Sequence, residues 1–408
     1  MAATTPKILC LTGCNPAGPD NGGIIRVRNL FRLLSRHGRV RVVLAGDYQE
    51  DALAPGADLG GFELVGAVRF QPTGNWSLAE RLRNELDPHF LNTNHSAARP
   101  ADRERLKQWL AEHDLVWVHN IQLANRFGLW RWPHSVLDID DIPSTQYQTE
   151  LALTTGLLAR VRVHRQVGLW RRREKRLLER FDAVSVCSEP DRLLLGGSGR
   201  IFRLPNAFQP PESPVTPQPV TPPRLGFIGD LRHTPNQQGC RWFVERVWPL
   251  ILARQPAARL RVAGRAGDQQ IFPADRNIDT LGWLADVHGE MATWSLTVVP
   301  ILTGGGTRVK IAEAFGRRCP VVATPVGAHG YEVVSGQDLL IADTPEQFAA
   351  HCLQILDQPA LGPALAESAW RKFNEKWTWE AQAGTVARMV ELVLSGAAAQ
   401  RQPGGLNS

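Results

Sequence analysis

Several features that define other classes of protein are missing from this sequence. No apolar run reaches the ~18 residues that a membrane span requires, and the opening residues, MAATTPKILCLTGCNPAG, have too short an apolar stretch and too little charge for a signal peptide. The six cysteines are scattered, without a CxxC pair or a partner at zinc spacing, which predicts reduced thiols and no structural zinc. We therefore expect a cytoplasmic protein.

Lysine is also scarce, with six among 46 cationic residues. The net charge of +6 is compatible with an anionic substrate or surface, but no nucleic-acid recognition motif accompanies it, so nucleic acid is not an expected partner. The chain has 408 residues, of which 43% are hydrophobic and 21% are charged, and this predicts a soluble protein of two or three globular domains.

The cationic residues are concentrated in residues 160–180, RVRVHRQVGLWRRREKRLLER, which hold nine of them against two glutamates. Val163, Val167, Trp170 and Leu177 recur at helical spacing, so one face of a helix can pack while the arginines face outward. Charge runs of this kind are usually solvated helix faces. The alternative is weak peripheral contact with anionic headgroups at the inner face of a membrane, or with a phosphorylated acceptor.

A proline-rich segment, QPPESPVTPQPVTPP, divides the chain at residues 209–223 and is expected to be a stiff, extended linker. On each side, short apolar strands alternate with amphipathic helices, a pattern that indicates parallel sheets covered by helices. We therefore predict an α/β fold with two doubly wound, Rossmann-like domains, at residues 1–208 and 224–375, that face a cleft. A helix over residues 376–396 is expected to cross back to the first domain, and residues 397–408 are expected to form a flexible tail.

Two helices can be assigned more closely. Residues 24–38 place Leu30, Phe31 and Leu34 on one helical face, which predicts that this face is buried. In the second half, residues 239–254 are expected to form one helix.

The second half contains the stretch ILTGGGTRVKIAEAFG, residues 301–316. Its glycines have no Cβ atoms, so their N–H groups can approach a ligand closely. Thr307 is placed to cap a helix over residues 308–315, with Gly316 past its end, and a helix N-terminus beside a glycine loop suits phosphate. The order of residues excludes a P-loop, because Lys310 follows the threonine. The alternative is a tight strand-to-helix turn followed by an ordinary amphipathic helix.

Several segments of the second half together resemble the GT-B glycosyltransferases of the retaining, family 4 (group 1) type, in the branch with a GGGTR loop. They are FIGDLRHTPN, WFVERVWPLI, LRVAGR, IDTLGWLADV, LTVVPILTGGGTRVKIAEAFGRRCPVVATPVGAHG and DLLIADTPEQFA. In the first half, NGGIIRVRNLFRLLS and LPNAF resemble the family's first glycine loop and the stretch before its hinge. The resemblance implies a hexosyltransferase that moves a sugar from a nucleoside diphosphate sugar to a glycan, lipid-linked or small-molecule acceptor with retention of anomeric configuration.

The resemblance also implies roles for the donor loop. The backbone N–H groups of Gly304, Gly305, Gly306 and Thr307 would bind the sugar diphosphate. Arg308 and Lys310 would counter the charge that grows on the leaving group, and Glu313 would accept hydrogen bonds from the ribose. Because cations and amides supply this stabilisation, neither a metal nor another cofactor is expected.

The sequence departs from the commoner family pattern in two places. Gly305 stands where the family usually has an acid, and Asp230 and Asn236 stand where it often has arginine and lysine after the first strand of the second domain. These departures suggest that Arg308 takes over the diphosphate contact. They leave the recognition of the donor sugar open.

On the acceptor side, His119 ends an apolar strand at a place where family members often have a histidine near the reacting sugar. His119 could bind the sugar or accept the proton of the acceptor hydroxyl. The alternative is a histidine that only forms local hydrogen bonds at the end of the strand. Asp138 and Asp140 form a DxD pattern, but a lone DxD is weak evidence for a metal site. These acids, with Asp141, are expected instead to cap a strand end and line the cleft. Asp140 or Asp141 could still be an acceptor-side carboxylate, and Asp140 is the candidate catalytic residue.

Three further residues are candidate donor-site residues. Gly22 and Gly23 could let the first loop approach the donor phosphate or the acceptor, or could merely form a strand-to-helix turn. Arg265 ends a strand and could border the nucleotide, or could be a simple surface charge.

Two other functions fit the same architecture. A sugar-nucleotide 2-epimerase-like isomerase would need acid and base residues gathered around one sugar, and only scattered candidates are present. A non-catalytic sugar-nucleotide-binding protein stays open because of Gly305.

Overall fold

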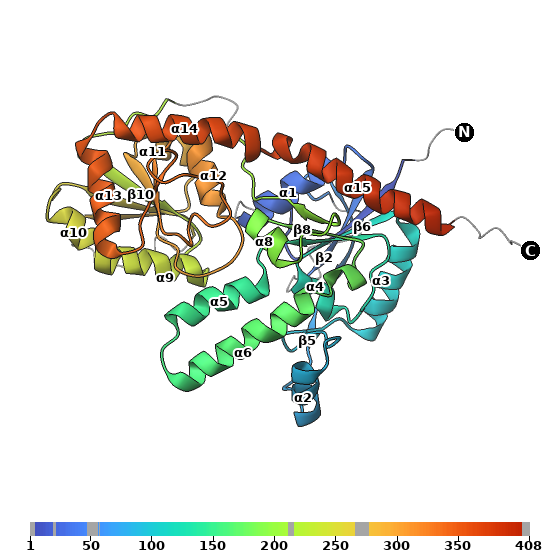
Figure 1. Ribbon diagram of the computed structural model, residues 1–408. Helices are drawn as coiled ribbons and strands as arrows, with labels where there is room; N and C mark the ends of the chain where they lie inside the picture. The colour runs from blue at the N-terminus through green and yellow to red at the C-terminus, as the bar shows by residue number, and fades with distance from the viewer. Residues whose placement is uncertain are drawn as a thin grey trace, which may run out of the picture. The chain divides into compact units, whose positions relative to one another are not determined.

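The computed structural model describes residues 5–18, 22–46, 56, 58–210, 216–265 and 277–401 (Figure 1). The chain forms two compact units. Unit 1 comprises Met1–Ser144, Leu157–Leu204 and Ala383–Ser408, and unit 2 comprises Thr145–Gly156 and Pro205–Gln382.

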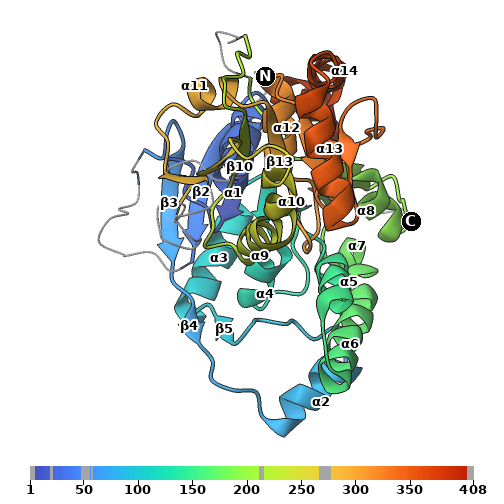
Figure 2. The same ribbon diagram turned by 90° about the vertical axis from the view of Figure 1, so that its left-hand side faces the viewer.

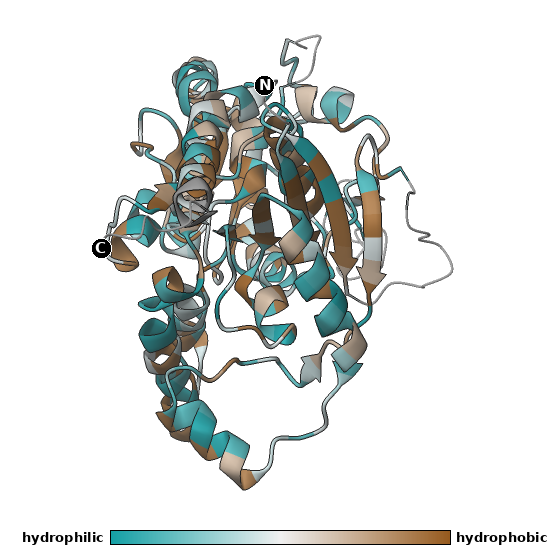
Figure 3. Cartoon of the chain, turned by 90° about the vertical axis from the view of Figure 1, so that its right-hand side faces the viewer, coloured by the Kyte–Doolittle hydropathy of each residue, from teal (hydrophilic) through white to brown (hydrophobic). Residues whose placement is uncertain are grey.

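Unit 1 is built on a sheet of seven parallel strands in the order β3-β2-β1-β6-β7-β8-β9. The central strands are mostly apolar and are buried along their whole length, as expected of a parallel sheet with helices on both faces (Figure 3). The strands are β1 (Lys7–Thr12), β2 (Arg39–Ala45), β3 (Glu63–Val68), β6 (Leu115–His119), β7 (Ser135–Ile139), β8 (Ala183–Val186) and β9 (Ile201–Arg203). A small antiparallel pair, β4 (Gln71–Pro72) and β5 (Ser96–Ala97), lies apart from this sheet.

The helices of unit 1 present their apolar faces to the sheet. Leu30, Phe31 and Leu34 of α1 are fully buried, as predicted. Val163, Val167 and Trp170 of α6 are also buried, which confirms this part of the predicted packing face. Leu177, expected on the same helix, is buried too but begins the separate helix α7. The helices are α1 (Gly22–Leu34), α2 (Leu78–Leu86), α3 (Pro100–Glu112), α4 (Ile121–Arg126), α6 (Leu157–Glu174), α7 (Leu177–Arg180) and α8 (Glu189–Leu194).

Unit 2 is built on a second parallel sheet, with the order β12-β11-β10-β13-β14-β15. Each face carries its own hydrophobic cluster, one around Phe243 and Phe348 and the other around Phe315 and Phe373. The strands are β10 (Arg224–Ile228), β11 (Arg259–Ala263), β12 (Ile278–Gly282), β13 (Leu296–Val299), β14 (Val321–Ala323) and β15 (Leu340–Ile341). The helices (Figure 2) are α9 (Thr234–Trp242), α10 (Trp248–Leu252), α11 (Val287–Ala292), α12 (Val309–Gly316), α13 (Pro345–Asp357) and α14 (Leu361–Lys376). Two doubly wound parallel sheets confirm the predicted fold class.

The predicted single helix over residues 239–254 is wrong in detail. A π-helical segment, η2 (Phe243–Val247), joins α9 to α10. Pro249 has no N–H to donate to the preceding turn, and the N–H of Trp248 bonds instead to the carbonyl of Phe243, five residues back. The hydrogen-bonding pattern therefore changes beside the proline.

The described part of the proline-rich segment is not a free connector. The N–H groups of Gln218 and Val220 donate to the carbonyls of Ala292 and Thr293, which fixes residues 218–220 against the end of α11. Residues 211–215 lie outside the described residues.

Two helices are shared between the units along the chain. α5 (Pro143–Leu153) belongs to unit 2 from Thr145, and α15 (Trp379–Arg401) belongs to unit 1 from Ala383. α15 continues beyond the predicted end at residue 396, into the segment that was expected to be a flexible tail. Residues 402–408 of that segment lie outside the described part of the chain.

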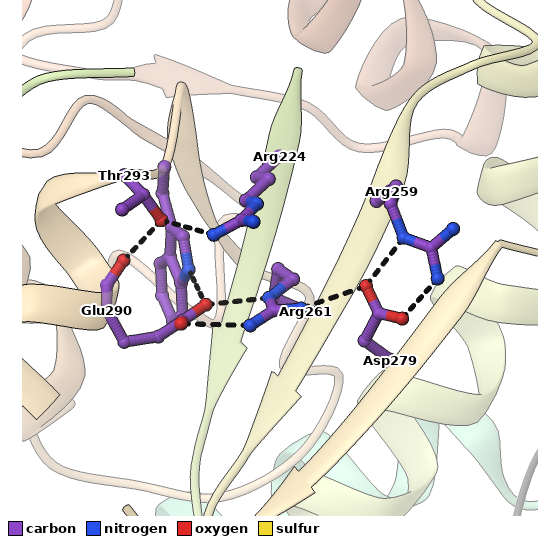
Figure 4. A network of polar contacts seen from close by, with 7 residues as sticks. Arg224, Arg259, Arg261, Asp279, Glu290 and Thr293 are labelled. Carbon is purple, nitrogen blue, oxygen red and sulfur yellow. Dashed lines mark hydrogen bonds and ion pairs between the residues drawn. The ribbon is translucent and has the colours of Figure 1, made fainter. Parts of the chain in front are cut away.

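An ion-pair network crosses the amino ends of β10, β11 and β12 in unit 2 (Figure 4). Arg261 donates from Nε to Oε1 of Glu290 at 2.7 Å and from Nη1 to Oδ2 of Asp279 at 3.0 Å, and Arg259 pairs with the same aspartate. Glu290 in turn accepts from the indole of Trp294 at 2.8 Å. The network connects β11 and β12 to α11 at the amino ends of the strands, whereas the glycine loop lies at their carboxyl ends.

All six cysteines are free thiols, as expected. Among the described residues, no helix combines the length and the apolar character that crossing a membrane requires.

Candidate functional site

The glycine loop of unit 2 lies where the strand order of the sheet reverses. β10 pairs with β11 on one side and with β13 on the other, and the chain winds away in opposite directions from these two strands. Ligands of open α/β sheets bind at the carboxyl ends of the strands at such a point. Gly229 follows β10 there, and residues 300–308 follow β13.

The backbone of this loop requires glycine at two positions. Gly304 has φ +113° and Gly306 has φ +63°, conformations that L side chains rarely adopt. A Cβ atom on Gly304 would also lie 2.7 Å from Nη2 of Arg308. Gly304, Gly305 and Gly306 are all buried, so the loop is packed rather than open to solvent.

Side chains from distant parts of unit 2 hold the loop. Asn206 clamps Thr307: its backbone N–H donates to Oγ1 of Thr307 at 2.9 Å, and its side-chain amide donates to the carbonyl of Thr307 at 2.8 Å. The hydroxyl of Thr149 on α5 accepts from the N–H of Gly304 at 2.9 Å. The N–H of Gly304 is therefore already engaged, and a diphosphate could use it only by displacing Thr149.

The predicted helix start was wrong by one residue. α12 runs from Val309 to Gly316, and its N-cap is Arg308, which makes no capping bond through its side chain. Thr307 lies one residue before this N-cap, and its hydroxyl accepts from the N–H of Asn206. Gly316 is the last residue of the helix rather than the residue after it. The start of α12 still follows directly on the glycine loop, so its first N–H groups lie beside that loop.

Arg308 folds back over the loop. Its Nη2 donates to the carbonyl of Thr303 at 3.3 Å, and its carbonyl accepts from the hydroxyl of Tyr331 at 2.8 Å. Its Nε is buried without a hydrogen-bond partner among the described residues. An unpaired guanidinium N–H of this kind can donate to an anionic ligand.

Lys310, two residues further, is partly buried on the first turn of α12. Its Nζ donates to Oδ1 of Asn236 at 2.9 Å and lies 4.3 Å from the centre of the Phe227 ring. Burial, and then the neighbouring charge of Arg308, lower the pKa of Lys310 to about 7. In the part of the chain that the structure describes, neither Arg308 nor Lys310 forms an ion pair with a carboxylate.

Glu313 is partly buried on the next turn of α12. One of its carboxylate oxygens accepts from Nη2 of Arg317 at 3.0 Å, and Arg317 also contacts His288 at 2.8 Å. The ion pair with Arg317 therefore orients Glu313 before any ligand binds.

Arg265 lies two residues after the end of β11. Its guanidinium lies 5.4 Å from the ring centre of Trp283, and its carbonyl accepts from Leu231 at 3.0 Å. Asp230, at a position where the family often has arginine, forms an ion pair with Arg232. The carboxylate of Asp230 is thus neutralised locally.

In unit 1, Asp138 is the centre of a buried polar cluster. Arg26 of α1 donates from Nε to Oδ2 at 3.0 Å and from Nη2 to Oδ1 at 2.5 Å, while Ser185 donates to Oδ1 at 2.6 Å. His119 contacts Oδ2 through Nδ1 at 3.1 Å. Burial alone would raise the pKa of Asp138, but Arg26 and His119 hold it well below its ordinary value.

The expectation that the DxD acids line a cleft is wrong for Asp138, which is fully buried in unit 1 because its oxygens accept from these donors. Asp140, directly after β7, is partly exposed and accepts from the N–H of Asp141 at 3.0 Å. Among the described residues, no group of three or more His, Cys, Asp and Glu side chains is arranged to hold a metal ion.

His119 is buried at the end of β6, beside the point where the order of the first sheet reverses between β1 and β6. Burial alone would lower its pKa, but hydrogen bonds to Asp138 and to the Cys14 thiol raise it above the ordinary value. The raised pKa favours a charged imidazolium, which can orient a substrate oxygen but is poorly suited to accept a proton. Gly22 and Gly23 begin α1 in the same unit, and Gly22 is exposed.

Sequence reasoning did not identify Arg26, Asn206 or Thr149. Arg26 and Asp138 are separated by 112 residues, and Thr149 and Gly304 by 155. LPNAF pointed to the neighbourhood of Asn206, but no local pattern shows which loop this residue clamps.

Comparison with known proteins places these features in a wider context. Residues 222–358 match the family described as Glycosyl transferases group 1. A curated relative, an uncharacterized 44.6 kDa protein in the cps region of Klebsiella pneumoniae, is 27% identical over 137 residues. This match covers 31% of the chain and 35% of the relative, so the chain is aligned with only about a third of that protein's length.

Solved structures match nearly the whole chain. Sucrose-phosphate synthase from Thermosynechococcus elongatus aligns with a TM-score of 0.67 at 17% identity and covers 96% of this chain and 100% of its own. HepE of Anabaena, solved with UDP and glucose, aligns at 0.60 and 15%, covering 95% and 99%. A mutant of TarM from S. aureus, solved with Fondaparinux, alpha-GlcNAc-glycerol and UDP, aligns at 0.62 and 11%, covering 95% and 99%. The fold is therefore that of the GT-B glycosyltransferases.

Proposed function

We propose that the protein transfers a hexosyl group from a nucleoside diphosphate sugar to an acceptor, with retention of anomeric configuration and without a metal. The observation that carries this proposal is the pair Arg308 and Lys310, two cations without a carboxylate partner among the described residues, beside a buried glycine loop at the sheet's switch point. The group 1 match over residues 222–358 and the GT-B fold support the same reading.

The chemistry requires positive charge at this place. When the bond from the anomeric carbon to the diphosphate oxygen breaks, the electron pair stays on the diphosphate, and negative charge develops there. Arg308 and Lys310 would stabilise that charge together with N–H groups of the loop and of the first turn of α12. Because these groups are held in place, they need little rearrangement during the reaction.

The remaining candidates have distinct proposed roles. Glu313, oriented by Arg317, would accept hydrogen bonds from the ribose hydroxyls. His119 would orient a sugar oxygen as an imidazolium, and Asp140 is the carboxylate available on the acceptor side. Gly305 has no side chain with which to hold the donor sugar, so the identity of that sugar would depend on other groups.

Two variants test the donor site separately. Glu313→Gln should weaken binding of a nucleoside diphosphate by about 1.5 to 3 kcal/mol, the value of a hydrogen bond to a charged group. Arg308→Ala should lower turnover at saturating donor more than it weakens donor binding, since it meets charge that grows in the transition state. Calorimetric titration and steady-state rates with a panel of nucleotide sugars measure both quantities. Effects within about 0.5 kcal/mol in both variants would contradict the assignment.

The same panel distinguishes the other functions. Release of nucleoside diphosphate with glycosylated acceptor supports transfer, an isomerised sugar nucleotide indicates an epimerase, and binding without turnover indicates a sensor. Activity should persist in excess EDTA. Loss of activity that only Mn²⁺ or Mg²⁺ restores would overturn metal independence.

We also propose that unit 1 binds anionic membranes weakly through α2 and α6. Six large apolar side chains of these two helices are exposed, with exposed fractions from 52% to 86%. They are Leu78, Leu82 and Leu86, which share one face of α2, and Leu157, Leu158 and Val161 of α6. α6 carries exposed arginines, and an ion pair between Arg165 and Glu85 at 3.2 Å connects the two helices. Leucines flanked by arginines are the composition that anionic lipid surfaces attract.

Co-sedimentation with phosphatidylglycerol vesicles at low and high salt tests this surface. Each cation near the membrane should contribute about 1 kcal/mol at most, so salt should weaken binding. Leu82→Glu should reduce sedimentation, whereas Leu193→Glu, at an exposed leucine of α8, is the matched control. Equal sedimentation of the two variants, or no binding at low salt, would contradict membrane binding and would indicate that α2 and α6 are simply exposed to solvent.

A further inference from the structure

We propose that Asn236 is a positioning residue that holds the Lys310 ammonium toward the diphosphate without cancelling its charge. This inference rests on the proposed donor site, and it assigns a function to a side chain outside the glycine loop and α12. Asn236 would direct a lysine in a partly buried place without forming an ion pair with it.

The orientation of the Asn236 amide is fixed from both sides. Its Nδ2 donates to the carbonyl of Asp230 at 2.9 Å, and a carbonyl can only accept. Its Oδ1 therefore faces Nζ of Lys310, 2.9 Å away, and an ammonium can only donate. The assignment of the amide oxygen and nitrogen follows from these two partners. Asn236 lies in the first turn of α9, immediately after Pro235, so its backbone is held as well.

The surroundings leave little room for another arrangement. A Cβ atom on Gly229 would lie 3.0 Å from Nζ of Lys310 and 2.9 Å from Nδ2 of Asn236. Phe227 covers the ammonium at 4.3 Å. The glycine after β10 therefore makes space for the amide and the ammonium to meet.

The charged and titratable groups that act on Lys310 are few. Arg308 and Glu313 lie on its own helix segment and Cys240 lies on α9, and of these only Glu313 carries a carboxylate. Glu313 is already bonded to Arg317, and Asp230, near the other side of the amide, is bonded to Arg232. The acceptor that touches the ammonium directly is thus a neutral amide.

The neutral amide of Asn236 differs from a carboxylate in its effect on the charge of Lys310. A carboxylate at position 236 would form an ion pair with Lys310, raise its pKa and compete with the diphosphate for the same charge. The amide directs the ammonium but leaves its charge uncompensated. Since burial and Arg308 lower the pKa of Lys310 to about 7, part of the free protein is uncharged at this residue near neutrality.

Binding of a diphosphate is then coupled to protonation. An anion beside Lys310 favours its charged form, so binding should take up a proton, and affinity should fall as the pH rises above the pKa of the free state. Where Lys310 is largely deprotonated in the free protein, this fall approaches about tenfold per pH unit.

The test is calorimetric titration of the full chain with UDP from about pH 6 to pH 9, in pairs of buffers with different ionisation enthalpies. Lys310→Met has no ionisable side chain at this position, so it shows how much of the pH dependence arises from UDP itself. Lys310→Arg has a cation that stays charged over the whole pH range. Relative to Lys310→Met, the wild type should lose affinity above about pH 7 and take up a proton, whereas Lys310→Arg should do neither.

The variants of Asn236 separate positioning from a merely structural role. Asn236→Leu removes an acceptor that favours the charged ammonium, so it should weaken UDP binding by about tenfold at alkaline pH. It should recover only part of this loss at about pH 6, where Lys310 is protonated but is no longer directed by the amide. Asn236→Asp, nearly isosteric, should weaken binding across the range and remove the pH dependence, because the new carboxylate keeps Lys310 charged but occupied.

The outcomes distinguish this inference from the proposed function. If UDP and other nucleoside diphosphates fail to bind the wild type, the donor site itself is wrong. If UDP binds but the wild type follows the same pH profile as Lys310→Met, the role of Lys310 protonation is overturned and the donor site stands. A pH-independent loss in Asn236→Leu, with no change in Asn236→Asp, would also overturn the inference.

Discussion

Removing the charge of Asp138 should destabilise unit 1 far more than removing a surface carboxylate from the same sheet. Asp138→Asn keeps the shape of the side chain but places an NH₂ group where an oxygen accepted from Arg26 or Ser185. Arg26 is 1% exposed and Asp138 is fully buried, so the guanidinium would be left without its counter-charge in a place that water does not reach.

The expected size follows from this burial. Breaking a buried ion pair by removing one partner costs about 3 to 5 kcal/mol, because the remaining charge is uncompensated. Glu63→Gln is the matched control: Glu63 on β3 pairs with Arg39 of β2 at 2.6 Å, but the side chains are 30% and 70% exposed. An exposed pair contributes about 0 to 1 kcal/mol, since solvent already screens it.

Hydrogen exchange at the backbone amides of β6 and β7 measures the effect locally, which matters because a chain with two units need not unfold in one step. Exchange there should accelerate by about 10²- to 4 × 10³-fold in Asp138→Asn, at about 1.4 kcal/mol per tenfold. The amides of β10 and β13 in unit 2 provide an internal reference. An acceleration in Asp138→Asn no larger than that in Glu63→Gln would refute the reasoning.

Two further predictions concern unit 2. Gly226→Ala should destabilise this unit by about 1 to 3 kcal/mol or more, because the added Cβ would lie 1.9 Å from the ring of the buried Trp294. Hydrogen exchange at the amides of β10 measures this destabilisation, and unchanged protection there would contradict the prediction. Burial opposes ionisation of Glu290, but its hydrogen bonds to Arg261 and Trp294 lower its pKa. The ionised carboxylate therefore stabilises the folded unit above the ordinary carboxyl pKa, and this stabilisation is lost as the pH falls. In urea titrations, Glu290→Gln should lose less free energy of unfolding on acidification than the wild type does.

The fold could be predicted from the sequence because buried parallel strands are short apolar runs. Strands such as β1, β6 and β13 are short runs of mostly apolar residues, which are visible in the sequence. β3 is an edge strand with ELVGAV alternately half-buried and buried, and β9 has only three residues. Edge and very short strands carry too little apolar patterning to be distinguished from loops.

The glycine loop was also identifiable, since the residues that form it are consecutive. The propensity of Thr307 as a helix cap gave an assignment that was wrong by one residue, and the hydrogen bond that Thr307 accepts from Asn206, 101 residues away, was not visible in the sequence. The engagement of Gly304 by Thr149 was equally invisible. Hydrogen bonds of this kind depend on which loops the tertiary fold brings together, and residue types and spacing within one segment do not encode that.

The polar contacts of buried cations in this chain divide into two kinds, and the difference bears on function. Arg26 forms an ion pair with Asp138, which compensates its charge. Arg180 lacks a carboxylate partner among the described residues, but its N–H groups donate to Asn125 and to two backbone carbonyls. Arg308 and Lys310 differ, since they lie close enough for Arg308 to lower the pKa of Lys310, and the amide that touches Lys310 is neutral. Two like charges held together in a partly buried place cost stability unless an anion joins them. Perturbed cations gathered in one place mark a candidate binding site. This cost in the free protein fits the proposed donor site, in which a bound diphosphate would supply the missing stabilisation.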